Sequence, residues 1–339
     1  KVRSRIVADQ LVKLIKEADH VVIMGHRMSD LDAIGAAEGV LRICKICDVP
    51  AVIAVKRDAT LAGSLIDALC RAGQRDDFID PKEALPIISK QTLCVVVDTY
   101  QVGLVESKEI LEKCGKVAVI DHHRKGVGYI ENPALVCHEP YSSSASELVT
   151  ELLQYVGDRD DKPNRVEAEG LLSGIMLDTQ DFTLHTGVRT FEAAAALRRY
   201  GAETERVRQL FDVTMTEYNA KADLVEKAQM YKNCAISVGG EIAPEARVAI
   251  AQAANDLLRI QGVDASFVAV QVSGGVNISA RSLGAVNVQV IMESLGGGGH
   301  QTMAAAQLKH ITPEAVRSRI ETAIDNYWAS QKKSSAAEK

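Results

Sequence analysis

Hydrophobic positions in the first half of the chain form short continuous runs instead of a polar–apolar alternation. Four of these runs predict β-strands, at residues 20–25, 50–55, 93–98 and 116–121. Helical periodicity separates them, first over about 30–45. Continuous apolar strands that alternate with helices are typical of a parallel sheet covered on both faces. We therefore expect an α/β domain built on a parallel sheet with flanking helices.

The second half of the chain changes from helical to strand-forming patterns near residue 233. Helical patterns dominate from 144 to 232, and short strands or helices then follow at 234–238, 266–273, 276–281, 287–295 and 304–308. This pattern predicts a smaller α/β domain with a short mixed sheet. The expected division is a first domain at 1–185, a helical linker at 186–232, a second domain at 233–330 and a polar, disordered tail at 331–339.

Composition and charge exclude several classes of protein. The 339 residues are 47% hydrophobic, but no apolar run reaches the ~18 residues that a membrane span needs. The net charge of −6 argues against a protein that binds duplex nucleic acid. Aromatic residues make up only 4% of the chain, which argues against a stacking surface for long single strands. The seven cysteines have no disulfide-framework spacing, so a reducing compartment is expected.

A first group of polar residues follows the first predicted strand directly. His26, Asp30 and Asp32 lie in the segment GHRMSDLDAIG. Hard oxygen ligands with one imidazole suit Mn²⁺ or Mg²⁺, and the spacing allows Asp32 to reach a neighbouring ion. The alternative is a helix N-terminus that Ser29 or Asp30 caps, which needs no metal.

A second group closes the third and fourth predicted strands. Asp98 ends one strand, and Asp121, His122 and His123 end the other, where adjacent histidines in extended backbone point in opposite directions. Asp178 lies in an apolar segment, where an ionised carboxylate needs a partner such as a cation. A shared carboxylate can hold two metal ions about 3.5–4 Å apart. The combined candidate ligand set is His26, Asp30, Asp32, Asp98, His122 and Asp178.

A third group lies in the second domain. Four glycines at 296–299 precede His300, and their backbone can approach an anion closely. Arg281 lies on a predicted strand among hydroxyl groups, as suits a bidentate phosphate contact. The alternative is a flexible turn and a surface arginine.

Together these motifs resemble the DHH/DHHA1 phosphoesterases. The segments HRMSDLDAIG, DHH and GGGGH occur in that family's order and cover nearly the whole chain. Within the family, the stretches 120–126, 138–155 and 174–202 resemble the catalytic region of the GdpP-type (YybT-type) cyclic-di-AMP phosphodiesterases.

The resemblance implies a role for each motif residue. The resemblance implies two divalent ions, both Mn²⁺. One ion would be bound by His26, Asp30 and Asp98, and the other by Asp32, Asp98, His122 and Asp178. His123 is expected to face the phosphate as a catalytic residue, and Asp121 to orient the histidines. Arg281, Gly298, Gly299 and His300 are the implied contacts to the far phosphate of a dinucleotide.

The implied activity is hydrolysis of cyclic di-AMP to linear 5′-pApA by a metal-bridging hydroxide. Two alternatives stay open: a nanoRNase or pAp phosphatase that acts on pApA or pAp, and a cyclic-dinucleotide sensor without turnover. A pyrophosphatase or polyphosphatase is a weaker option. The chain starts with Lys1 instead of methionine, so upstream membrane and sensor domains are expected in a longer protein, with this part on the cytoplasmic side. A homodimer and a monomer both stay open.

Overall fold

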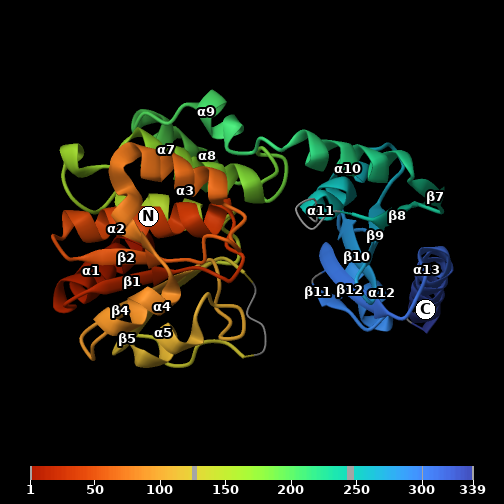
Figure 1. Ribbon diagram of the computed structural model, residues 1–339, viewed down its shortest axis with the longest axis horizontal. Helices are drawn as coiled ribbons and strands as arrows, with labels where there is room; N and C mark the ends of the chain where they lie inside the picture. The colour runs from red at the N-terminus through yellow and green to blue at the C-terminus, as the bar shows by residue number, and fades with distance from the viewer. Residues whose placement is uncertain (1, 124–127, 243–247, 300, 338–339) are drawn as a thin grey trace. The chain divides into compact units, whose positions relative to one another are not determined.

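The computed structural model describes residues 2–123, 128–242, 248–299 and 301–337 (Figure 1). The chain forms two compact units, which divide between Asp212 and Val213. Each unit contains its own sheet and its own buried cores. We describe each unit by itself.

The first unit is built on a six-stranded sheet in the order β3-β2-β1-β4-β5-β6, and every neighbouring pair is parallel. Its strands are β1 (Val21–Met24), β2 (Ala51–Ala54), β3 (Phe78–Ile79), β4 (Leu93–Val97), β5 (Lys116–Asp121) and β6 (Leu135–His138). The predicted parallel sheet is confirmed. The sequence did not predict β3, which has only two residues, or β6.

Helices cover both faces of this sheet, as Figure 1 shows for α2 and α7 on one side and α4 and α5 on the other. Alternate residues of each strand supply the two cores: Ile23 and Val95 face one, Val22 and Cys94 the other. The helices are α1 (Val2–Glu17), α2 (Leu31–Ile46), α3 (Gly63–Leu69), α4 (Pro81–Ala84), α5 (Lys108–Lys113), α6 (Ala145–Leu153), α7 (Arg165–Asp178), α8 (Val188–Arg199) and α9 (Thr204–Gln209). The sequence did not predict α1.

Close packing of α2 against α7 depends on glycine. A Cβ atom at Gly35 of α2 would lie 2.5 Å from the carbonyl oxygen of Gly170 on α7. A side chain there would force the two helices apart, and core positions of this kind tolerate little added volume. The contact matters for function because Asp32 lies in the first turn of α2 and Asp178 is the last residue of α7.

A buried acid–amide pair lies between α2 and the segment that follows α3. The amide nitrogen of Gln74 donates a hydrogen bond to Glu38 Oε1. Among the described residues, Glu38 Oε2 and Gln74 Oε1 are buried without a partner. A protonated Glu38 would satisfy both atoms, since its O–H can donate to the amide oxygen. Burial, with the nearby Glu167 carboxylate, raises the pKa of Glu38 to about 8.

We predict that Glu38→Gln makes the protein more resistant to alkaline pH. The pKa of Glu38 is higher in the folded state than in the unfolded state. Between about pH 4.5 and 8 the folded protein therefore keeps a proton that the unfolded chain has lost. As a result, the free energy of unfolding of the wild type falls as pH rises through this window. The unfolding free energy of the variant relative to wild type is expected to grow by about 1–2 kcal/mol between pH 6 and pH 8.5. Urea unfolding followed by circular dichroism measures this difference. Glu112→Gln, on an exposed position of α5, is the control; identical pH profiles for both variants would contradict the assignment.

The second unit contains a six-stranded mixed sheet in the order β11-β12-β10-β9-β8-β7, in which only the β8–β9 pair is parallel. The strands are β7 (Gln229–Tyr231), β8 (Cys234–Glu241), β9 (Ala265–Val272), β10 (Gly275–Ser282), β11 (Gly298–Gly299) and β12 (Met303–Lys309), and the helices are α10 (Met215–Glu226), α11 (Val248–Leu257), α12 (Val288–Ser294) and α13 (Pro313–Ala337). Helices α12 and α13 cover one face, and α10 and α11 cover part of the other. The predicted smaller α/β domain with a short mixed sheet is confirmed.

The division of the chain into two units differs from the domain boundaries predicted at residues 185, 232 and 330. Ala193 and Leu197 of α8 are buried in the core of the first unit, whereas Leu224 of α10 is buried in the second. The predicted linker at 186–232 is therefore divided between the two units, because its helices carry buried apolar residues of their own. The tail predicted as disordered at 331–339 is helical as far as Ala337, where α13 ends; residues 338 and 339 lie outside the described part. No helix in the described part is long and apolar enough to cross a membrane.

Candidate metal centre

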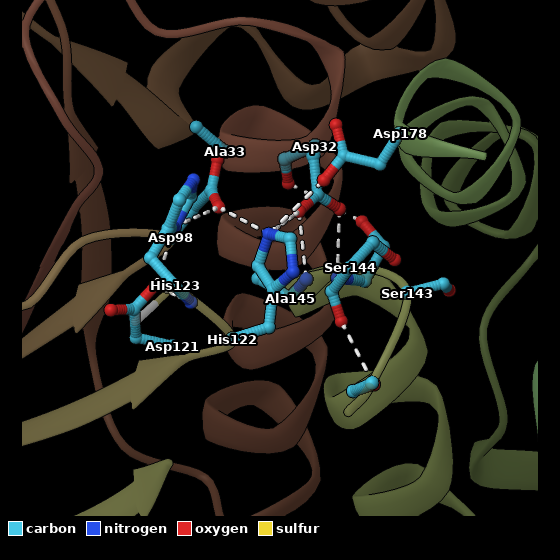
Figure 2. A network of polar contacts seen from close by, with 12 residues as sticks. Asp32, Ala33, Asp98, Asp121, His122, His123, Ser143, Ser144, Ala145 and Asp178 are labelled. Carbon is cyan, nitrogen blue, oxygen red and sulfur yellow. Dashed lines mark hydrogen bonds and ion pairs between the residues drawn. The ribbon is translucent and has the colours of Figure 1, made fainter. Parts of the chain in front are cut away.

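Polar side chains gather at the carboxyl edge of the first sheet (Figure 2). His26 follows β1 closely, Asp98 follows β4, and His122 follows β5. Because these three strands are parallel neighbours, their carboxyl ends meet at one edge. Asp98 has a left-handed backbone (φ 59°), which turns the chain sharply where the strand ends.

The Asp98 carboxylate lies between two histidines. Its Oδ2 is 3.4 Å from His26 Nε2, and its Oδ1 is 3.4 Å from His122 Nε2. His122 Nε2 is also 3.1 Å from Asp178 Oδ2, at the end of α7. Two sets of ligand atoms result, each lying within 4.8 Å of one another: His26, Asp30 and Asp98 in one, and Asp32, Asp98, His122 and Asp178 in the other. Asp98 is a member of both, so all six residues predicted as ligands come together.

Asp32 is fully buried at the N-terminus of α6. Its Oδ2 accepts a hydrogen bond from the backbone N–H of Ala145 at 2.7 Å, and its Oδ1 accepts one from Ser146 at 2.8 Å. These donors and the positive end of the helix dipole stabilise the carboxylate. Gly174 of α7 lies against it, because a Cβ there would be 2.6 Å from Asp32 Oδ1. The sequence indicated the start of α6 but not this contact.

Asp30 caps a helix and also lies next to His26, so the two interpretations that the sequence presented as alternatives are compatible. Its Oδ1 accepts hydrogen bonds from the backbone N–H groups of Asp32 and Ala33, which makes it the N-cap of α2. The same oxygen is 3.8 Å from His26 Nε2. A carboxylate has a second oxygen with lone pairs of its own, so capping through Oδ1 does not prevent ligation.

The electrostatics of the cluster fit a cation. Asp98 Oδ1 and His122 Nε2 are buried without a hydrogen-bond partner in the described part of the chain. Burial and the neighbouring carboxylates raise the pKa of Asp32 well above its ordinary value, and burial raises that of Asp178 to about 6. Burial would lower the pKa of His26, but Asp30 and Asp98 outweigh it and raise the value to about 11. Several buried carboxylates around imidazoles form an oxygen-rich site that suits a divalent ion such as Mn²⁺ or Mg²⁺.

The two histidines of the DHH motif lie side by side, with ring centroids 4.4 Å apart. The predicted opposite orientation is therefore wrong, because β5 ends at Asp121 and the next residues are no longer in a strand. The side chain of His122 is 14% exposed and that of His123 is 49% exposed. His122 thus faces the buried carboxylates, and His123 is accessible to a ligand.

Three hydrogen bonds fix the position of His123. Asp121 Oδ1 accepts hydrogen bonds from the backbone N–H of His123 at 3.2 Å and from its Nδ1–H at 2.8 Å. Since a carboxylate only accepts, the Nδ1 proton is in place and Nε2 is left for another partner. His138, at the end of β6, donates from Nε2 to the carbonyl oxygen of His123. Sequence reasoning did not single out His138, although the segment HEPYSSS contains it.

In the second unit, Arg281 lies on β10 and is partly buried. Its Nη1 donates to Ser279 Oγ at 3.0 Å and to the Ala280 carbonyl at 2.9 Å, and no carboxylate among the described residues pairs with it. Burial lowers its pKa to about 10. Gly298 and Gly299 form the short strand β11 instead of the predicted open loop, because a glycine at 299 (φ 149°) allows a close approach to Ala304. His300, also predicted as a phosphate contact, lies outside the described residues.

Comparison with protein families gives two matches. Residues 20–175 match the DHH family, N-terminal domain, and residues 243–329 match the DHHA1 domain. The chain belongs to the DHH/DHHA1 family. The family resemblance predicted from the sequence is confirmed. DHH phosphoesterases use divalent metal ions, in agreement with the Asp and His cluster described above.

Curated relatives of this DHH/DHHA1 chain include two bacterial proteins. It is 45% identical over 333 residues to the cyclic-di-AMP phosphodiesterase GdpP of Geobacillus thermodenitrificans, covering 97% of this chain and 50% of that protein. It is 41% identical over 333 residues to the cyclic-di-AMP phosphodiesterase PdeA of Listeria monocytogenes, with the same coverage. The chain spans about half the length of these relatives. The expected similarity to GdpP-type proteins is confirmed.

Among solved structures, an exopolyphosphatase-related protein from Bacteroides fragilis has a TM-score of 0.81. It is 21% identical, and the match covers 96% of this chain and 98% of that one. At this level of identity, the similarity establishes the fold that both chains share.

Proposed function

We propose that this chain is a divalent-metal-dependent phosphodiesterase that hydrolyses cyclic di-AMP to linear 5′-pApA. The observation that carries the proposal is the position of Asp98, whose carboxylate belongs to both ligand sets at the sheet edge. A carboxylate shared between two oxygen-rich sites is the arrangement that two-metal hydrolases use. The substrate comes from the relatives, which are named as cyclic-di-AMP phosphodiesterases.

Two Mn²⁺ ions are proposed for the centre. His26, Asp30 and Asp98 would hold one ion, and Asp32, Asp98, His122 and Asp178 would hold the other. Bound ions of this kind lower the pKa of water and offset the negative charge of a phosphate.

The protein's own groups would orient the substrate. His123 presents Nε2 toward the phosphate, since Asp121 holds its Nδ1–H. Burial alone would lower the pKa of His123, but the hydrogen bond with Asp121 and the charge of Asp98 raise it and favour a cationic ring next to an anionic substrate. Arg281, with Gly298 and Gly299, would bind the second phosphate, and the guanidinium has no carboxylate partner among the described residues to compete with it.

Product analysis tests this proposal directly. Metal-stripped protein is supplied with Mn²⁺ and given cyclic di-AMP, cyclic di-GMP, pApA and pAp in parallel, and the products are separated by chromatography. We expect Mn²⁺-dependent conversion of cyclic di-AMP that stops at pApA. Preference for pApA or pAp would assign the chain to the nanoRNases and pAp phosphatases, and no turnover would favour a sensor.

Arg281→Ala is expected to raise KM for cyclic di-AMP roughly tenfold or more, because one charge-assisted phosphate contact is lost. Turnover of bis(4-nitrophenyl) phosphate, which has one phosphate only, is expected to stay within about twofold of wild type. Steady-state kinetics on both substrates measure the difference. Arg319→Ala on α13 is the control. Equal losses on the two substrates would refute a role at the second phosphate.

Four expectations from the sequence stay predictions. They are the upstream membrane and sensor domains, the cytoplasmic location, the homodimer and the exclusion of duplex nucleic acid as a ligand.

A further inference from the structure

Residues 138–146, the β6–α6 segment, contact the metal centre at both of their ends. At one end, His138 donates a hydrogen bond to the carbonyl oxygen of His123. At the other end, the first two backbone N–H groups of α6 donate to the Asp32 carboxylate, and Figure 2 shows Ala145 next to it. The position of this segment therefore affects both a metal ligand and the residue that faces the phosphate.

The start of the segment lies at the edge of the first sheet. β6 is the last strand in the sheet order and pairs with β5 alone among the described strands. The backbone N–H of Glu139 continues this pairing, since it donates to the carbonyl oxygen of Asp121 at 3.1 Å. The Glu139 side chain forms ion pairs with Arg3 of α1 at 3.1 Å and with Arg189 of α8 at 3.3 Å. Side-chain contacts thus take the place of a further strand at this end.

Arg189 is held firmly by a second carboxylate. Its Nε and Nη2 donate to the two carboxylate oxygens of Glu151 on α6, at 2.7 and 2.6 Å. A bidentate pair of this kind fixes the direction of the guanidinium group. The side chains of Glu139 and Glu151 are only 19% and 14% exposed, so water competes little for these contacts. Arg189 therefore connects α6 to the end of β6.

Thr190, the next residue of α8, holds the other end of the segment. Its Oγ1 donates to Glu147 Oε2 at 2.7 Å, and both side chains are 1% exposed. The same oxygen of Glu147 accepts hydrogen bonds from the backbone N–H and the hydroxyl group of Ser143. Glu147 thus joins α8 to the first turn of α6, which supplies the donors to Asp32.

We propose that Arg189 and Thr190 are positioning residues for the metal centre, although neither belongs to a ligand set. Arg189 acts through Glu139 on the strand end that holds the second histidine of the DHH motif. Thr190 acts through Glu147 on the start of α6, and so on Asp32. The effect of Arg189 on turnover rests on the proposed function, whereas the effect of Thr190 rests on metal binding alone.

The test of Thr190 compares Thr190→Val with Thr190→Ser. Valine keeps the shape of the side chain but cannot donate to Glu147, so Asp32 loses part of its support. The affinity for one of the two Mn²⁺ ions is expected to fall roughly tenfold or more, as loss of a group that orients a metal ligand typically does. Titration of metal-stripped protein with Mn²⁺, followed by the electron paramagnetic resonance of the free ion, measures this without turnover. Thr190→Ser keeps the hydroxyl group and should bind both ions like the wild type.

The test of Arg189 uses Arg189→Met. Methionine has a similar length but lacks the guanidinium group, so Glu139 loses its contact to α8. The kcat for cyclic di-AMP is expected to fall roughly tenfold, because a small displacement of a catalytic group is costly. KM and both Mn²⁺ affinities should stay within about twofold of wild type. Glu139→Gln should lower kcat similarly, and the double variant should lose little more, since both residues act through one contact. Arg199→Met, at an exposed position near the other end of α8, is the control.

The two variants together separate positioning from a general loss of stability. A merely structural role would lower metal affinity and turnover in the same proportion in Thr190→Val and Arg189→Met. That result, or a wild-type kcat in Arg189→Met, would overturn the proposal, as would two sites of wild-type affinity in folded Thr190→Val. If Thr190→Val does not fold, the kinetics of Arg189→Met decide the matter. If the wild type does not hydrolyse cyclic di-AMP, the proposed function fails, and the Mn²⁺ titrations of the two Thr190 variants still test the inference.

Discussion

Asp98→Asn is expected to reduce hydrolysis of cyclic di-AMP by at least about 1000-fold, which corresponds to about 4 kcal/mol of transition-state stabilisation. Both ligand sets include this carboxylate, so one substitution weakens two metal sites at once. Asparagine is the best replacement, because Asp98 has φ 59° and asparagine adopts left-handed backbone more readily than alanine. The folded structure should therefore persist while the negative charge is lost.

Two measurements test this expectation. Initial rates are determined by chromatography, and the number of bound Mn²⁺ ions is determined by mass spectrometry of the metal. Asp48→Asn is the matched control, because Asp48 has nearly the same backbone angle (φ 56°) but is exposed next to the end of α2. An Asp98→Asn variant that keeps two tightly bound ions and a tenth of the wild-type rate would exclude the shared-carboxylate mechanism.

The sequence identified those parts of the site that follow from local pattern. His26, Asp98 and His122 come directly after buried strands, and the carboxyl ends of parallel strands meet at one edge. Asp178 was inferred from the cost of burying a charge in an apolar segment, and it does lie 3.1 Å from His122. Local pattern and simple electrostatics were sufficient for these residues.

The remaining features depend on contacts between distant segments. The hydrogen bonds from Ala145 and Ser146 to Asp32 span more than 110 residues, and no local signal marks them. The opposite orientation predicted for His122 and His123 assumed that the strand continued beyond Asp121. Gly298 and Gly299 form strand β11 only because they pair with β12, whereas the run of glycines by itself indicates a loop.

The role of His123 gives the second large expected effect. His123→Ala should lower kcat for cyclic di-AMP by about 100–1000-fold, as removal of one donor to a developing negative charge typically does. The number of bound Mn²⁺ ions should not change, because His26, His122 and the carboxylates complete both proposed sites without His123.

The number of bound Mn²⁺ ions in His123→Ala distinguishes a phosphate contact from a metal ligand. His123 Nδ1 lies 3.6 Å from Asp98 Oδ1, and Asp98, His122 and His123 form a third set of neighbouring ligand atoms. Geometry alone thus permits His123 to bind either a metal ion or the phosphate. Asp121 favours the phosphate, since its 2.8 Å hydrogen bond occupies the ring nitrogen that faces Asp98. His20→Ala, at the opposite end of β1, is the control. Loss of one Mn²⁺ ion in His123→Ala, but not in this control, would instead make His123 a ligand.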